Sequence, residues 1–106
     1  MGQTAKYLYV VRMDVAPEKE AEFNELYDRE HIPALLKVPG VLRATRYQTT
    51  TAGQPKYVAI YELTSPDIPS SAAFRQAGDS GEWPHKIRPY CTNRSHIIYE
   101  RIDASQ

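Results

Sequence analysis

The chain has 106 residues, the size of one domain, and its 13 Lys and Arg balance 13 Asp and Glu. Zero net charge without a basic run argues against nucleic acid and anionic membranes as partners. One cysteine, Cys91, excludes an internal disulfide, and the polar start and short apolar runs indicate neither a signal peptide nor a membrane span. We therefore expect a single soluble, cytoplasmic domain over residues 1–106.

Runs rich in β-branched and aromatic residues predict four strands, at residues 7–14, 41–48, 56–63 and 95–102. After the first strand, residues 17–30 carry apolar side chains at helical spacing. We expect Pro33 to break or kink this helix near His31 and then to start another turn through Lys37. Before the last strand, residues 69–77 predict a second short helix and residues 82–90 only a turn or two. The order β-α-β-β-α-β predicts an α+β, ferredoxin-like fold with a four-stranded antiparallel sheet.

Both faces of this sheet are largely apolar. One face of the first and third strands carries Leu8, Val10, Val58 and Ile60, and the opposite face carries Tyr7, Tyr9, Tyr57 and Tyr61. We expect the tyrosine face to be free of helices and covered by a second copy of the chain, because exposed aromatic surface of this extent marks an interface or a ligand groove. The prediction is a homodimer around a tyrosine-lined pocket. Alternatively, the rings only hold the dimer together.

Residues 24–47 read N-x-x-Y-D-x-E-H-I-P-A-L-L-x-V-P-G-V-x-x-A-x-R-Y, and residues 55–63 read P-K-Y-V-A-I-Y-E-L. These segments resemble the dimeric α+β barrel superfamily and, within it, the EthD-like group. The resemblance implies ferredoxin-like subunits that pair sheet to sheet, each with a pocket between its sheet and its helices. The superfamily includes cofactor-free monooxygenases, muconolactone-type isomerases, polyketide cyclases and haem-degrading enzymes, so the fold alone does not choose the reaction.

Four ionisable side chains gather where the first helix meets Pro33: Tyr27, Asp28, Glu30 and His31. Asp28 is three residues before His31, so its carboxylate can reach the imidazole on the same helix face. A carboxylate on one ring nitrogen leaves the other free to exchange a proton near neutral pH, which predicts His31 as general acid/base and Asp28 as its orienting partner. Alternatively, His31 only caps the helix C-terminus. Glu30 lies in the apolar arc and needs a partner there.

The residues expected to bind substrate are Tyr7, Tyr9, Tyr27, Arg43, Tyr57, Tyr61, Trp83 and His85. Arg43 would hold a carboxylate or polarise an enolate if its strand face lines the pocket; otherwise it forms a surface ion pair. His85 either lies at the pocket entrance or in an exposed loop, and His96 faces solvent or a cross-strand neighbour. Cys91 is more typical of a structural thiol than of a nucleophile.

The three histidines lack metal-ligand spacing, and the chain has no nucleotide-binding or nucleophile-elbow motif, so we expect neither metal nor cofactor. The leading hypothesis is a cofactor-independent isomerase, lyase or cyclase acting on a small carbonyl-bearing or aromatic metabolite. The alternatives are a cofactor-free monooxygenase on a phenolic substrate, which itself activates oxygen, and a non-catalytic dimer that binds a lipophilic ligand. Haem degradation is disfavoured, because the first strand lacks the asparagine that the resemblance implies.

Overall fold

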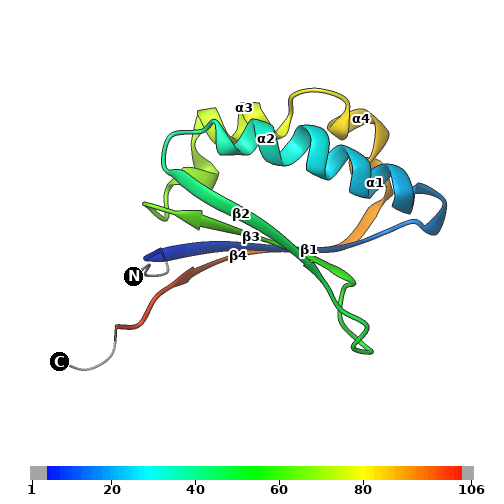
Figure 1. The fold of residues 1–106 in the computed structure, drawn as a ribbon, viewed down its shortest axis with the longest axis horizontal. Helices are drawn as coiled ribbons and strands as arrows, with labels where there is room; N and C mark the ends of the chain where they lie inside the picture. Colours follow the sequence, from blue (N-terminus) through cyan, green and yellow to red (C-terminus); the bar gives the residue numbers. More distant parts are fainter. Residues whose placement is uncertain (1–4, 104–106) are drawn as a thin grey trace.

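The computed structural model describes residues 5–103. Its strands are β1 (Tyr7–Val15), β2 (Val41–Gln48), β3 (Tyr57–Leu63) and β4 (Cys91–Glu100). Neighbouring strands are antiparallel and follow the order β2-β3-β1-β4 across the sheet. The helices lie together on one face of this sheet (Figure 1). The predicted α+β, ferredoxin-like fold is therefore confirmed.

The helical layer consists of two segments. The first contains η1 (Pro17–Lys19), α1 (Glu20–Leu26), η2 (Tyr27–His31) and α2 (Ile32–Leu36), and the second contains η3 (Ile68–Ser70), α3 (Ala72–Gly78), α4 (Trp83–Lys86) and η4 (Arg88–Tyr90). The second segment matches the predicted short helix and the few turns after it. The last strand begins four residues earlier than predicted, at Cys91, because the turn η4 ends directly before it.

The turn predicted from Pro33 through Lys37 is present as α2, and of the two outcomes predicted near His31 the chain shows no break. Instead, η2 is a π-helical turn, in which the backbone N–H of Ile32 donates to the carbonyl of Tyr27, five residues back. In a regular α-helix the Pro33 ring would clash with the carbonyl of Arg29, and a wider turn relieves that clash. The helix therefore continues through α2, and Figure 1 shows α1 and α2 as one rod.

Gly40 connects α2 to β2 in a conformation that favours glycine. Its φ is +92°, in the left-handed region. A Cβ at this position would lie 2.7 Å from Oγ1 of Thr64, whose backbone N–H donates to the Gly40 carbonyl at 3.0 Å. The glycine of the P-G-V sequence thus allows the start of β2 to lie close to the end of β3.

The tyrosine face of the sheet is covered by this chain's own helices, which corrects the prediction that a second copy covers it. Tyr57 and Tyr61 are 6% and 1% exposed and belong to the core between sheet and helices. The helix-free face carries the aliphatic residues of β1 and β3 instead. Alternation along a strand shows which side chains share a face but not which face the helices cover, and the larger aromatic side chains fill the helix-covered core.

Candidate functional site

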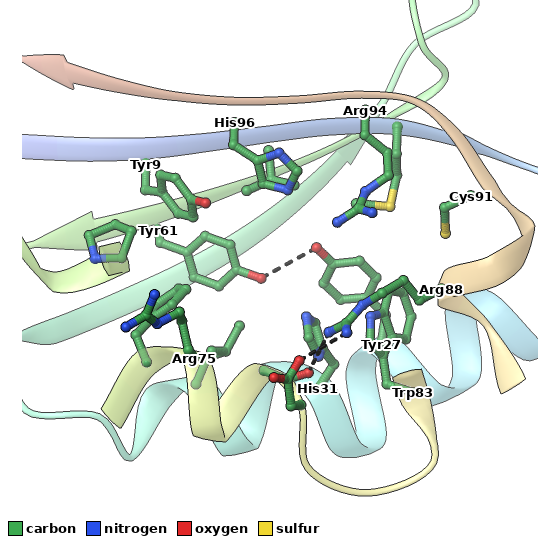
Figure 2. Close-up of a pocket in the computed structure, with 17 residues that line it drawn as sticks. Tyr9, Tyr27, His31, Tyr61, Arg75, Trp83, Arg88, Cys91, Arg94 and His96 are labelled. Carbon is green, nitrogen blue, oxygen red and sulfur yellow. Dashed lines mark hydrogen bonds and ion pairs between the residues drawn. The ribbon is translucent and has the colours of Figure 1, made fainter. Parts of the chain in front are cut away.

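A cavity of about 280 Å³ lies between the sheet and the second helical segment. Its floor is formed by β1, β3 and β4, and its walls by η2, α2, α3 and α4 (Figure 2). Buried aromatic side chains form the inner wall, and exposed polar ones form the mouth. The lining residues include Tyr9, Tyr27, His31, Tyr61, Phe74, Arg75, Asp79, Trp83, Arg88, Cys91, Arg94 and His96.

His31 is placed in this cavity by the π-helical turn. Its Nδ1 is the one buried side-chain nitrogen or oxygen within residues 5–103 that has no hydrogen-bond partner. Its Nε2 is not among these buried atoms, and the His31 side chain lines the cavity. Burial, and then the positive charge of Arg88, lowers the pKa of His31 to about 4. The imidazole is therefore neutral at pH 7, and no backbone carbonyl accepts a hydrogen bond from it in the described chain.

The ring of Trp83 covers His31 in a stacked arrangement, and Glu30 holds the tryptophan in place. One oxygen of Glu30, Oε1, accepts hydrogen bonds from the backbone N–H groups of Glu82 and Trp83, at 2.7 and 3.0 Å. These are free donors at the start of α4, which a carboxylate satisfies as a capping group. Gly81, with φ +71°, lets the chain pass directly over this carboxylate. This is the partner that Glu30 was expected to need.

Tyr27 and Tyr61 face each other across the cavity. Their hydroxyl oxygens lie 3.3 Å apart and share one hydrogen bond (Figure 2). Burial raises the pKa of Tyr27 to about 12 and raises that of Tyr61 well above its usual value, so both stay protonated. Because the pair uses only one of its two protons, one hydroxyl keeps an O–H to donate to a bound molecule.

The polar side of the cavity carries more positive than negative charge. Arg88 donates to Oδ1 of Asp79 at 2.9 Å and to the carbonyl of Gly78 at 2.9 Å. Arg75 reaches the cavity from α3 and Arg94 from β4. Both are exposed, which places them at the mouth.

Two further side chains from β4 line the cavity, His96 and Cys91. Burial lowers the pKa of His96, whose ring centroid lies 6.0 Å from that of Tyr9. The thiol of Cys91 contacts the carbonyl of Ile87 at 3.6 Å, and burial raises the pKa of this thiol. A raised pKa suppresses the thiolate, so Cys91 is suited to packing rather than to nucleophilic attack.

Of the residues expected to act on substrate, five come together around the cavity: Tyr9, Tyr27, His31, Tyr61 and Trp83. They come from β1, η2, β3 and α4, and the helix-covered face of the sheet brings them together. Their chemical roles stay predictions.

Asp28 does not contact His31, so the predicted orienting pair does not form. Its exposed carboxylate accepts a hydrogen bond from Nη1 of Arg46 at 2.9 Å. The wider π turn contributes to this difference, because it rotates the residues beyond it relative to a regular helix, on which the three-residue spacing was based.

Arg43 lies on the other face of the sheet, so it does not line the cavity. A register shift between Val41 and Arg43 sends Val41 into the core and places Arg43 opposite Glu62, 3.7 Å from its carboxylate. Such a bulge adds a residue to one strand and breaks the alternation of side chains along it, and Arg43 forms the surface ion pair that was the alternative prediction.

Three other predicted binding residues lie outside the cavity. Tyr7 packs against the core at the start of β1, and Tyr57 bonds to Glu20 and Asn24 beneath α1. His85 is exposed on α4. Within residues 5–103, no three His, Cys, Asp or Glu side chains form a group able to hold a metal ion, and no helix is long and apolar enough to span a membrane.

The sequence did not predict four of the residues that line the cavity: Arg75, Arg88, Arg94 and His96. Arg75 follows the predicted helical residue Phe74, and Arg94 and His96 lie at or beside the start of the predicted last strand. His96 pairs with Val11, which is on the helix-covered face. Alternation along the last strand could therefore have predicted which face His96 occupies. Arg94 lies two residues before His96, so alternation places it on the same face, and the same signal applied to it.

Together, the four-stranded sheet and the helices on one of its faces define the class of fold: a ferredoxin-like α+β protein with an aromatic cavity between the two layers. No family model and no curated protein sequence matches the chain. Solved structures do match its fold. An EthD family protein from Bacillus halodurans is 13% identical, with a TM-score of 0.64 over 91% of this chain and 99% of that one.

Two more solved structures extend this comparison. SnoaB of Streptomyces nogalater, described as a cofactor-independent oxygenase, is 26% identical with a TM-score of 0.64, over 94% of this chain and 97% of that one. The haem degrader MhuD of Mycobacterium tuberculosis, solved with two haems in its active site, is 15% identical with a TM-score of 0.61, over 94% and 99%. Further structures described as monooxygenases also share the fold. The resemblance to the dimeric α+β barrel superfamily and its EthD-like group is thus confirmed at the level of the fold.

Proposed function

We propose that this protein is a cofactor-independent monooxygenase acting on an electron-rich phenol. The observation that carries the proposal is the aromatic cavity into which a neutral, unpartnered His31 opens beside the Tyr27–Tyr61 pair. The similarity to SnoaB supports oxygenation rather than the isomerase, lyase or cyclase reaction that was expected first. The monooxygenase was the alternative interpretation of the sequence.

The proposed reaction needs no external reductant. A phenol with a free position opposite its hydroxyl loses a proton, and the phenolate gives one electron to O₂. The resulting radicals combine at the free ring position to form a hydroperoxide, which then eliminates water. One oxygen atom remains as the new carbonyl of a quinone, and the other leaves as water with the two hydrogens that the substrate loses. The substrate therefore supplies all the electrons.

His31 is the proposed base for the first step. For this role its ring carries its proton on Nδ1 and presents the Nε2 lone pair to the substrate hydroxyl. A base with a pKa of about 4 facing a phenol of pKa about 10 makes the transfer uphill by about 8 kcal/mol. The ion pair formed at about 4 Å recovers about 4 kcal/mol at an effective dielectric constant of 20. The spare Tyr O–H and the positive charge around the cavity stabilise the phenolate further.

Haem degradation is the weaker candidate. The likeness to MhuD, at 15% identity, carries the fold alone. The described β1 contains no asparagine, in keeping with the expectation drawn from the resemblance. A cavity of about 280 Å³ is also at the small end of the range of ligand pockets and favours a compact aromatic substrate.

The experiment is oxygen uptake by the purified protein with anthrone and with substituted phenols whose position opposite the hydroxyl is free, followed by mass spectrometry after reaction under ¹⁸O₂. We expect one O₂ consumed per quinone formed and one labelled oxygen in the product. His31→Ala is expected to lower kcat about 10²-fold to 10⁴-fold, whereas His85→Ala, at an exposed position, keeps full activity. Activity of His31→Ala within threefold of wild type, with the fold intact, removes His31 from the mechanism. Tight binding without oxygen uptake favours the non-catalytic binder.

We also propose that the protein is a homodimer, formed through the helix-free face of the sheet rather than the tyrosine face. This face carries Leu8, Val10, Val58, Ile60, Ile97 and Tyr99. Ile97 and Tyr99 are 41% and 45% exposed in the single chain, which leaves apolar surface for a partner to cover. Sedimentation should show a dimer at micromolar concentration and a monomer for Ile60→Lys, while Leu36→Lys on the helical layer stays dimeric. A monomeric wild-type protein would contradict the proposal.

A further inference from the structure

The charge around the cavity differs from that of the chain as a whole. The full sequence has a net charge of zero. Three arginines and one aspartate line the cavity, which gives its lining a net charge of +2. His31 adds no charge at pH 7, because its pKa is lowered to about 4. A concave, partly apolar site focuses such a field and attracts anions.

Only one of these three arginines has a carboxylate partner. Arg88 is paired with Asp79 at 2.9 Å. Arg75 and Arg94 form no side-chain hydrogen bond or ion pair within residues 5–103. Most other arginines of the described chain are paired with acids: Arg29 with Glu25, Arg43 with Glu62, Arg46 with Asp28 and Arg101 with Asp103. Arg12 is the further exception, on the helix-free face of the sheet.

The two unpaired arginines approach the cavity from opposite layers. Arg75 is on α3 and Arg94 is on β4, and Figure 2 shows them on opposite sides of the cavity. In Figure 2, Tyr61 and Tyr27 lie between them, and these two side chains and that of Trp83 are buried. A molecule whose ring occupies the inner part would therefore present its outer end to the two guanidinium groups.

We propose that the substrate carries a carboxylate as well as its phenolic ring, and that Arg75 and Arg94 bind this carboxylate at the mouth while the ring lies among Tyr27, Tyr61 and Trp83. This proposal rests on the proposed function, and it names a substrate class: hydroxylated aromatic carboxylic acids. Guanidinium groups suit a carboxylate because their planar N–H donors match its two oxygens. They also remain charged at any physiological pH.

The two arginines would also fix the orientation of the bound substrate. With the carboxylate at the mouth, the hydroxyl points inward, toward Nε2 of His31 and the spare Tyr27–Tyr61 proton. Arg75 and Arg94 are thus specificity-determining residues: they decide which phenols bind and which end enters first. A neutral phenol of the same size would lack this orientation and bind more weakly.

The test compares two probes of equal size, a hydroxynaphthoic acid and the hydroxynaphthamide with the same substitution pattern. Their dissociation constants are measured by isothermal titration calorimetry, in dilute buffer and at high salt. Fluorescence of Trp83, the single tryptophan, reports whether the cavity is the site. We expect the acid to bind about tenfold tighter or more than the amide, with an advantage that shrinks at high salt.

Substitutions of the two arginines test whether they bind the carboxylate of the acid. Arg75→Gln and Arg94→Gln should each weaken binding of the acid about tenfold and leave binding of the amide unchanged. Both residues are exposed, so the fold should tolerate these changes. Arg29→Gln, on the outer face of η2 and paired with Glu25, is the matched control and should change neither constant.

Two outcomes overturn the proposal: equal affinity for acid and amide, or acid binding that neither arginine variant weakens. Its failure is distinct from failure of the proposed function. If the acid binds through Arg75 and Arg94 without oxygen uptake, the assigned ligand class holds and the oxygenase fails. If neutral phenols are oxidised with the same kcat/KM as their carboxylated analogues, the oxygenase holds and this assignment fails.

Discussion

Trp83 lies flat on His31: the ring centroids are 4.5 Å apart and the planes differ by 19°. Tyr27 meets the same imidazole edge-on, at 5.1 Å and 89°. The two aromatic rings shield His31 from water, and this desolvation is the main cause of its lowered pKa. The pKa of His31, the proposed base, therefore depends on the position of Trp83.

The first prediction concerns Glu30, which anchors Trp83. Glu30→Ala leaves the N–H groups of Glu82 and Trp83 without their acceptor, and should lower the free energy of unfolding by about 1 to 3 kcal/mol. As Trp83 loosens, the pKa of His31 should rise toward its ordinary value of 6.5. Urea unfolding and an NMR titration of His31 measure the two effects.

The control for this experiment is Glu25→Ala. Glu25 is on the same helical segment but pairs only with the exposed Arg29, so its loss should cost at most about 0.5 kcal/mol and leave the titration of His31 unchanged. If the two variants behave alike, Glu30 does not hold the tryptophan.

The second prediction concerns stability and pH. The pKa of His31 is about 4 in the folded chain and about 6.5 when unfolded, so the unfolded state binds the proton more tightly. Stability is therefore full above about pH 6.5 and falls as the pH drops toward 4. Between pH 7 and pH 5 the loss should be about 2 kcal/mol. His31→Phe should remove most of this loss, and His85→Gln should retain it. A pH profile unchanged in His31→Phe would show that other groups cause the decline.

The third prediction concerns Gly81. A Cβ on this residue would lie 2.7 Å from Oε2 of Glu30, and its φ of +71° disfavours any other residue. Gly81→Ala should therefore lose about 2 kcal/mol or more. Gly53→Ala, with φ +83° but open space around it, should lose only about 1 kcal/mol. Because the clash needs the carboxylate, the double variant with Glu30→Ala should lose less than the sum of the single changes. Strict additivity would argue against the contact.

The fourth prediction separates two arginines of β2. The guanidinium of Arg46 bonds to Asn24 and Asp28 and lies 4.6 Å above the ring of Tyr27. Its side chain is only 15% exposed, against 72% for Arg43. Arg46→Ala should lower the free energy of unfolding by about 2 to 3 kcal/mol, through lost packing and charged hydrogen bonds. Arg43→Ala should change it by less than about 0.5 kcal/mol. Equal losses in urea unfolding would contradict this assignment.

Local patterns in the chain are sufficient for most of the fold. The strand at residues 41–48 was predicted with its observed bounds, because alternating apolar residues and the preceding Gly40 act within a few residues. The helix after Pro17 and the further turn from Pro33 to Lys37 were also predicted, but not the π-helical turn that joins them. A proline indicates that the regular helix must change near it, but the local sequence does not determine whether the change is a break, a kink or a π turn.

The sequence by itself determined the ferredoxin-like topology and drew attention to His31, because periodicity and a short motif act along the chain. Only the tertiary structure decided which face of the sheet the helices cover, that Asp28 pairs with Arg46, and that Arg75 and Arg94 meet at one cavity. Side chains from separate elements become neighbours only when the layers pack, and strand alternation is identical for either choice of covered face.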